Sequence, residues 1–219
     1  MTPSGAEAQA FVRANTRLET PSLLPEIKLH LASAALPLWQ ATEDQLRAQG
    51  LPPPFWAFAW AGGQALARYL LDHPEIAAEK RVLDFAAGSG VQGIAAALAG
   101  ARAVAASEID GFAIAALRLN AAANGVRLAL LEADLVGQAN PGWDLVLAGD
   151  VCYERPMAER VFAWLRRLAG EGATVLLGDP GRSYLPREGL EKLAGYAVPT
   201  TRELEDTDLR NAGVWRVLP

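Results

Sequence analysis

From residue 81 onward, short apolar runs alternate with longer stretches whose apolar residues recur every three to four positions. The short runs predict strands and the longer stretches predict helices, because side chains repeat every 2 residues along a strand and every 3.6 along a helix. The strands are expected at 81–86, 102–108, 128–132, 143–149 and 173–178. The helices are expected at 91–99, 111–123, 156–169 and 186–194. This order predicts an α/β fold with a mostly parallel, doubly wound sheet covered on both faces.

The C-terminal end breaks this alternation. Two runs that predict strands, 198–204 and 214–218, flank the polar stretch 205–213, and no helical pattern lies between them. We expect the two runs to form an antiparallel hairpin at one edge of the sheet. With this hairpin the expected sheet is seven-stranded.

The first part of the chain is expected to be an N-terminal extension, residues 1–50, of a single globular unit whose main domain is 51–219. A short helix is expected at 6–17, and the alternation of apolar and polar residues over 27–31 predicts a strand or extended segment. A further helix is expected at 64–73, after a glycine pair and before a proline.

Composition narrows the class of protein. The 219 residues are 51% hydrophobic and 21% charged, with a net charge of -5 and a pI near 5.1, which is typical of a soluble globular domain and lacks the basic surface of a nucleic-acid binder. No apolar run approaches the 18 residues of a membrane span, and no secretory signal is visible. The single cysteine, Cys152, fits a reducing compartment. We therefore expect a cytoplasmic protein with neither nucleic acid nor membrane as its partner.

Residues 82–93 (Val-Leu-Asp-Phe-Ala-Ala-Gly-Ser-Gly-Val-Gln-Gly) combine an apolar strand, a glycine turn and the start of a helix. Gly88, Gly90 and Gly93 match G-x-G-x-x-G, a pattern of dinucleotide sites. Without Cβ atoms such a turn can approach a ligand closely. Asp84 at the end of the strand can bind an ammonium group, which S-adenosylmethionine (SAM) carries. The glycine loop alone leaves both cofactors open, and Asp84 favours SAM.

Two further carboxylates follow the next two strands. Glu108 can accept both ribose hydroxyls of either cofactor. Asp134 can accept the adenine amino group of SAM, with the N–H of Leu135 nearby. Because parallel strands end at the same edge of a sheet, Asp84, Glu108 and Asp134 are expected to line one crevice.

The fourth strand is followed by Asp150 and Tyr153, which match the Asp-x-x-Tyr signature of the lysine-directed seven-β-strand methyltransferases. The chain most resembles the electron-transfer-flavoprotein β-subunit lysine methyltransferases and their bacterial counterparts, and the predicted C-terminal hairpin is typical of class I SAM-dependent methyltransferases. The segments that carry the resemblance are 54–70, 84–93, 106–110, 120–124, 149–153 and 199–206.

This resemblance implies methyl transfer from SAM to a lysine ε-amine of a protein, leaving S-adenosylhomocysteine. The electron transfer flavoprotein β-subunit is the favoured substrate, with ribosomal proteins as an alternative. The resemblance also implies that Trp60 packs against the cofactor, that Ile109 contacts it, and that Asp150 and Tyr153 are catalytic.

The protonation of the acceptor limits what Asp150 can do. With a pKa of about 10.4, only about one lysine in a thousand is neutral near pH 7.4. A nearby carboxylate favours the charged ammonium further. We therefore expect Asp150 to capture and orient the lysine rather than to act as a simple base. Tyr153 is expected to hydrogen-bond the amine or to close the pocket.

Three alternatives stay open from the residues alone. The aromatic segment 55–60 suits a small heterocyclic substrate, which would make the chain a small-molecule N-methyltransferase. The literal G-x-G-x-x-G suits an NAD(P)-binding oxidoreductase, and a binding module without catalysis is the third. A metal site is not expected, because His30, His73 and Cys152 fall in no ligand motif.

Overall fold

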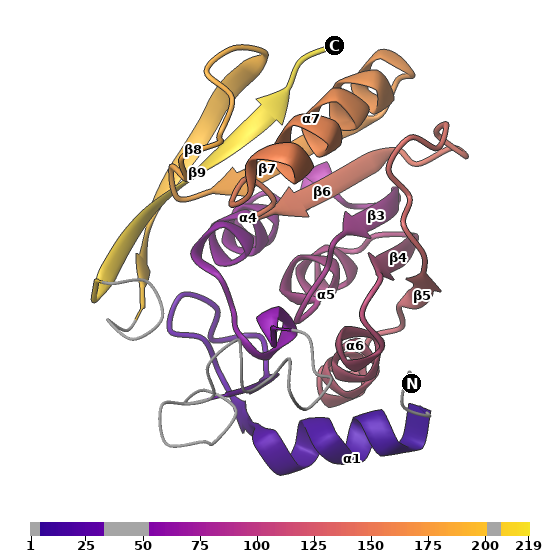
Figure 1. The fold of residues 1–219 in the computed structure, drawn as a ribbon, viewed down its shortest axis with the longest axis vertical. Helices are drawn as coiled ribbons and strands as arrows, with labels where there is room; N and C mark the ends of the chain where they lie inside the picture. Colours follow the sequence, from indigo (N-terminus) through magenta and orange to yellow (C-terminus); the bar gives the residue numbers. More distant parts are fainter. Residues whose placement is uncertain (1–4, 33–52, 201–206) are drawn as a thin grey trace.

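The structure, a computed structural model, describes residues 5–32, 53–200 and 207–219. The strands of its central sheet are β3 (Arg81–Phe85), β4 (Ala103–Glu108), β5 (Ala129–Glu132), β6 (Leu145–Gly149), β7 (Thr174–Asp179), β8 (Leu190–Pro199) and β9 (Leu209–Val217). Their order is β5-β4-β3-β6-β7-β9-β8 (Figure 1). Pairing is parallel from β5 to β7 and antiparallel at β9 and β8, so the predicted seven-stranded, mostly parallel sheet is confirmed.

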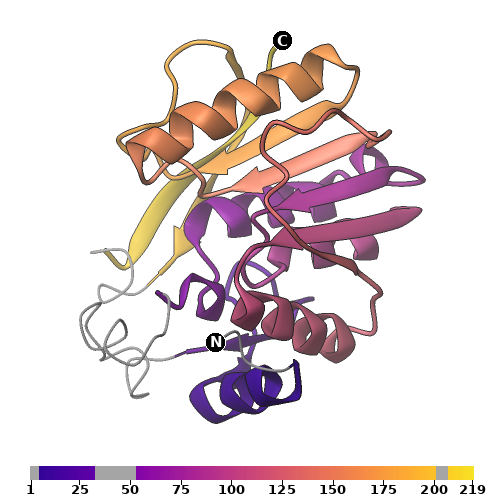
Figure 2. The same ribbon diagram turned by 45° about the vertical axis from the view of Figure 1, so that its right-hand side comes forward.

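Helices cover both faces of this sheet (Figures 1 and 2). One face carries α4 (Ala61–Asp72), α5 (Val91–Leu98) and α6 (Gly111–Ala123), and the other carries α7 (Arg155–Gly170). Successive strand residues alternate between the two faces, as Val82 and Leu83 do. The doubly wound arrangement is confirmed. Within the described ranges, no helix is long and apolar enough to span a bilayer.

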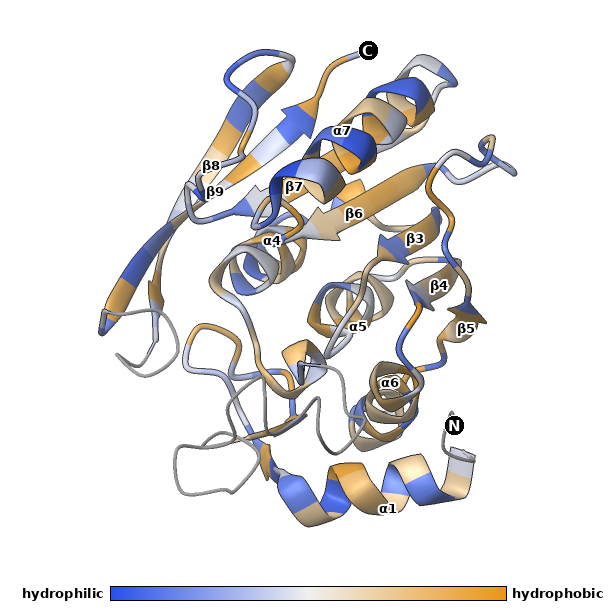
Figure 3. Cartoon of the chain, viewed as in Figure 1, coloured by the Kyte–Doolittle hydropathy of each residue, from blue (hydrophilic) through white to orange (hydrophobic). Residues whose placement is uncertain are grey.

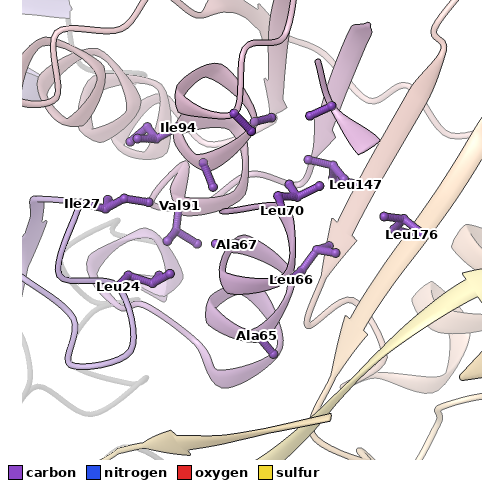
Figure 4. Packing of buried hydrophobic residues seen from close by; sticks show 14 of the residues in the cluster. Leu24, Ile27, Ala65, Leu66, Ala67, Leu70, Val91, Ile94, Leu147 and Leu176 are labelled. Carbon is purple, nitrogen blue, oxygen red and sulfur yellow. The ribbon is translucent and has the colours of Figure 1, made fainter. Parts of the chain in front are cut away.

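The largest hydrophobic core lies between α4, α5 and the sheet. Leu66 and Leu70 of α4 are fully buried and meet Leu147 of β6 (Figure 4). Each such leucine contributes roughly 1.5–3 kcal/mol by leaving water. Figure 3 shows that β6 is apolar along its length while β8 and β9 alternate, as expected of a central strand and an edge hairpin.

The N-terminal segment completes this core. Leu24 and Ile27 are fully buried in it, next to the short antiparallel pair β1 (Arg17–Glu19) and β2 (Leu29–Leu31). The predicted helix is present as α1 (Gly5–Asn15) and packs against α6. The expected domain boundary at residue 50 lies outside the described residues.

The helix predicted at 186–194 is wrong. Residues 190–194 belong to β8, which pairs with β9 from Leu190 to Pro199, and residues 187–189 form a bend before it. A β-bulge between Lys192 and Ala194 shifts the register and interrupts the alternation of side chains. Apolar residues therefore recur at a helix-like spacing within a strand. The C-terminal hairpin itself is confirmed, although both strands begin earlier than predicted, at Leu190 and Leu209, and 201–204 lie outside the described residues.

Candidate active site

A cavity of about 420 Å³ opens at the carboxyl ends of β3 and β6. Its floor comes from the loop after β3, residues 86–89, and one wall comes from residues 149–153 after β6. The strand order reverses between these neighbouring strands, which is where open α/β sheets bind their ligands. The 3₁₀ turn η1 (Phe55–Ala57) and Trp60 form the opposite wall.

The glycine loop turns sharply between β3 and α5. Gly88 and Gly90 adopt left-handed backbone conformations, with φ of +52° and +79°. A Cβ at Gly90 would lie 2.5 Å from Cδ2 of Leu117 on α6. Gly88 lines the cavity, whereas Gly90 lies behind it and lets the loop approach α6. Both glycines are required by backbone geometry.

Asp84 lies behind the cavity rather than in its lining. It is fully buried; its Oδ2 accepts the Gly93 N–H at 2.8 Å and its Oδ1 accepts Nε2 of Gln92 at 3.1 Å. Burial raises the pKa of Asp84 to about 8. The Asp84 side chain therefore stabilises the first turn of α5 by accepting hydrogen bonds from Gln92 and Gly93. This placement differs from the predicted contact with an ammonium, because the side chain turns toward the helix instead of the ligand space.

Gln92, which sequence reasoning did not single out, stands between Asp84 and the cavity. Its carbonyl oxygen Oε1 is buried and has no hydrogen-bond partner among the described residues. The side chain lines the cavity. A buried acceptor without a partner costs free energy, so a ligand N–H donor would be stabilised here. The sequence clue was its place in the first turn after the glycine loop.

Glu108 holds the position predicted for it at the cavity. Its Oε1 accepts the Gly88 N–H at 2.8 Å and its Oε2 accepts the Ile109 N–H at 3.0 Å. Burial raises the pKa of Glu108, and these two N–H groups oppose that shift. Ile109 also lines the cavity and is 75% exposed, leaving a large apolar side chain open to a ligand.

Asp134 and Leu135 are not among the cavity-lining residues. Asp134 caps its own turn by accepting the Val136 N–H at 2.9 Å, and its Oδ2 pairs with Nη2 of Arg160 at 2.7 Å. The loop after β5 thus directs this carboxylate toward α7. The proposed contacts of Asp134 and Leu135 with adenine stay a prediction.

Asp150 lies at the cavity wall with its carboxylate already fixed. Its Oδ2 accepts the Gly63 N–H at 2.7 Å, and its Oδ1 lies 3.0 Å from Nη2 of Arg182. A Cβ at Gly62 would come within 2.7 Å of Oδ2, so the glycine pair that starts α4 permits this approach. Asp150 itself has a φ of +57°, a conformation that costs a non-glycine residue about 1 kcal/mol.

The electrostatics of Asp150 follow from this burial. Desolvation raises its pKa to about 7, and the Arg182 guanidinium opposes the rise. Arg182 is a site residue that sequence reasoning missed, although its position directly after a Pro-Gly pair at the end of β7 was visible. Neighbouring Cys152 is buried, and burial raises the pKa of its thiol to about 12, so this thiol is not expected to act as a nucleophile.

Aromatic side chains close the cavity near Asp150. The Phe55 ring lies 5.4 Å from that of Tyr153 and 6.2 Å from that of Trp60, and Phe58 packs on Trp60 at 5.6 Å. Tyr153 lines the cavity as predicted and is 46% exposed. Such a wall can enclose an apolar stem and limit water.

The groups that line the cavity fit SAM. An apolar surface at Ile109, a carboxylate at Glu108 and an unpartnered amide oxygen at Gln92 suit an adenine ring, ribose hydroxyls and an ammonium group, respectively. The cavity volume also lies in the usual range for small-ligand sites, about 300–1,000 Å³.

Comparison with known proteins supports the same chemistry. The family model of ribosomal protein L11 methyltransferase (PrmA) matches residues 64–151. The electron transfer flavoprotein beta subunit lysine methyltransferase of Danio rerio is 36% identical over 222 residues, covering 98% of this chain and 85% of the relative. The Homo sapiens protein of the same name is 34% identical over 220 residues, covering 97% of this chain and 83% of the relative.

Among solved structures, magnesium protoporphyrin IX methyltransferase from Synechocystis PCC 6803 with bound SAM matches with a TM-score of 0.52 and 20% identity. The match covers 85% of this chain and 100% of that chain. At this identity the likeness supports the fold alone. The residue-level chemistry must come from the cavity itself.

Proposed function

Because the chain belongs to the family of electron transfer flavoprotein beta subunit lysine methyltransferases, we propose that it methylates a lysine of the electron transfer flavoprotein β-subunit. The chain is a SAM-dependent protein-lysine N-methyltransferase. When bound, SAM supplies a methyl group on a sulfonium sulfur, and transfer of that group to a lysine nitrogen leaves S-adenosylhomocysteine. The 36% identity over 98% of the chain carries the proposal.

The residues around the glycine loop supply separate contacts for the cofactor. Glu108 accepts the ribose hydroxyls, since two backbone N–H groups already hold its carboxylate in place. Gln92 offers Oε1 to the ammonium. Ile109 and Trp60 give apolar surface, and Asp84 acts indirectly by holding Gln92 and the Gly93 N–H.

The acceptor lysine enters beside Asp150 and Tyr153. Asp150 accepts an N–H of the amine and so directs the nitrogen lone pair into the cavity. Tyr153, together with Phe55 and Trp60, encloses the methylene stem and excludes water. Such orientation is the larger part of catalysis for a displacement that needs no covalent enzyme intermediate.

The test offers labelled SAM and three acceptors to the purified chain: electron transfer flavoprotein β-subunit, ribosomal protein L11 and a panel of small primary amines. We expect label on a lysine of the first alone. Transfer to L11 instead would change the substrate, and transfer only to small amines would make the chain a small-molecule N-methyltransferase.

Two variants make the test specific for the cavity. Asp150→Ala is expected to abolish transfer while S-adenosylhomocysteine still binds in calorimetry, which shows that the variant is folded. Glu154→Gln removes an exposed carboxylate that makes no helix-cap hydrogen bond, and should keep activity within about threefold. Unchanged activity in Asp150→Ala would contradict the assignment of this residue.

A further inference from the structure

The guanidinium of Arg182 contacts both the Asp150 carboxylate and the Trp60 ring, which lie beside the proposed position of the acceptor lysine. Its Nη2 and Nε lie 3.0 Å and 3.3 Å from Oδ1 of Asp150, and its Cζ lies 5.6 Å from the centre of the Trp60 ring. The Arg182 side chain is only 19% exposed and lines the same cavity. A lysine that reaches Asp150 must therefore also meet this cation.

The fold builds the position of Arg182 through a specific turn. Oδ1 of Asp179, at the end of β7, accepts the N–H groups of both Gly181 and Arg182 at 2.7 Å. Asp179 is 1% exposed, and Gly181 adopts a φ of +82°, which favours glycine. The turn directs the arginine back over the cavity rather than out to solvent.

This placement bears on how the acceptor is deprotonated. A lone carboxylate beside a lysine stabilises the ammonium form, which has no lone pair for the methyl carbon. A guanidinium on the same carboxylate offsets the charge of that carboxylate, and its own positive charge disfavours a second cation nearby. On the basis of the proposed function, we propose that Arg182 is a positioning residue that neutralises Asp150 so that the site accepts lysine as a neutral amine.

The proton balance is simple. The lysine ammonium gives its proton to water as it enters, and its nitrogen keeps the lone pair that forms the new N–C bond. Asp150 remains able to accept an N–H of the amine at Oδ2, because this oxygen has two lone-pair positions and the Gly63 N–H takes one of them, whereas Nη2 and Nε of Arg182 both bind Oδ1. Other titratable groups around this edge are Glu108, Asp110, Cys152, Tyr153, Glu154 and Asp179.

The first measurement is the pH profile of methyl transfer to the electron transfer flavoprotein β-subunit. Arg182→Gln removes the cation, so the pKa values of the lysine and of Asp150 both rise. We expect the acidic limb of kcat/KM to move up by about one pH unit or more. The loss of activity should thus be large at pH 7.5 and shrink toward pH 9.5. Arg182→Lys keeps the charge and should restore much of the wild-type profile.

The matched control is Arg155→Gln, which removes a guanidinium at the start of α7. Arg155 is 72% exposed and pairs only loosely with Glu159 at 3.5 Å, so its profile should follow that of the wild type. A loss in Arg182→Gln that is equal at every pH would indicate a merely structural role and overturn the proposal. Equal or faster transfer at neutral pH would overturn it as well.

The second measurement needs no acceptor protein. Carbon-13 NMR of aspartate-labelled protein, with Asp150→Asn to assign the resonance, follows the titration of the Asp150 carboxyl. We expect it to titrate at higher pH in Arg182→Gln than in the wild type, with Arg182→Lys between them. An unchanged titration refutes control of Asp150 by Arg182. If wild-type protein fails to methylate the flavoprotein, the proposed function falls, and this titration still decides the role of Arg182.

Discussion

Replacing Asp84 by Asn should remove a large part of the protein's sensitivity to rising pH. The wild-type carboxylate is fully buried and receives hydrogen bonds from Gly93 and Gln92. An Asn oxygen can still accept the Gly93 N–H, and its NH₂ group can donate to Oε1 of Gln92 after that amide rotates. The substitution therefore keeps the hydrogen bonds and deletes only the ionisation.

The magnitude follows from the raised pKa. Burial moves the pKa of Asp84 from 3.8 to about 8, so the folded state holds a proton that the unfolded state has lost. The stabilising contribution is full below the unfolded value and is lost as pH rises to the folded value. At roughly 1.4 kcal/mol per pH unit, the wild type should lose on the order of 3 kcal/mol between pH 5 and pH 7 that Asp84→Asn does not lose.

Urea unfolding at pH 5, 6, 7 and 8 measures this difference directly. Because the other buried carboxyl groups are present in both proteins, their contributions largely cancel in the comparison. Glu159→Gln, which removes a carboxylate that is 72% exposed, should differ from the wild type by no more than about 0.5 kcal/mol at any pH. Parallel curves for the wild type and Asp84→Asn would refute the argument that this carboxyl is fully desolvated.

Three further outcomes are expected. Gly90→Ala should destabilise the fold by more than Gly125→Ala, because both glycines have positive φ but only Gly90 lacks room for a Cβ; equal free energies of unfolding would contradict this. Glu108→Gln should weaken S-adenosylhomocysteine binding about tenfold or more in calorimetry, and Asp134→Asn should weaken it less, since Asp134 does not line the cavity. Cys152 should resist alkylation at pH 8 in the native protein, and rapid labelling would contradict its burial and raised pKa.

The central sheet could be predicted because its strands are continuously apolar and are separated by helical patterns. The runs around Val82 and Leu145 are buried on both faces, so their patterns carry little ambiguity. The C-terminal strand β8 could not be predicted in the same way. Its bulge at Lys192 disturbs the alternation, and its pairing with β9 overrides the local helical pattern.

In the candidate site, the location of the functional residues could be predicted, but the direction of their side chains could not. Glu108, Asp150 and Tyr153 follow strands whose carboxyl ends meet at one edge, so their common location follows from topology. The direction of a side chain does not follow from topology. Asp84 turns toward the Gly93 N–H and Asp134 toward Arg160, and neither contact has a sequence pattern of its own.

The contact between Arg182 and Asp150 could not be predicted from the sequence either. The approach of Arg182 to Asp150 depends on a turn in which a buried aspartate and a left-handed glycine fix the path of the chain. The Asp-Pro-Gly-Arg sequence at the end of β7 could have marked the turn, but not the carboxylate that the arginine contacts.

The intact mass of electron transfer flavoprotein β-subunit, measured after incubation with the chain and SAM, is the decisive test of lysine methylation by this protein. We predict an increase in steps of one methyl group, localised to lysine by fragmentation and absent when Asp150→Ala replaces the wild type. An unchanged mass with wild-type protein that binds S-adenosylhomocysteine, or methyl groups on a residue other than lysine, would show that the protein is not a lysine methyltransferase for this substrate.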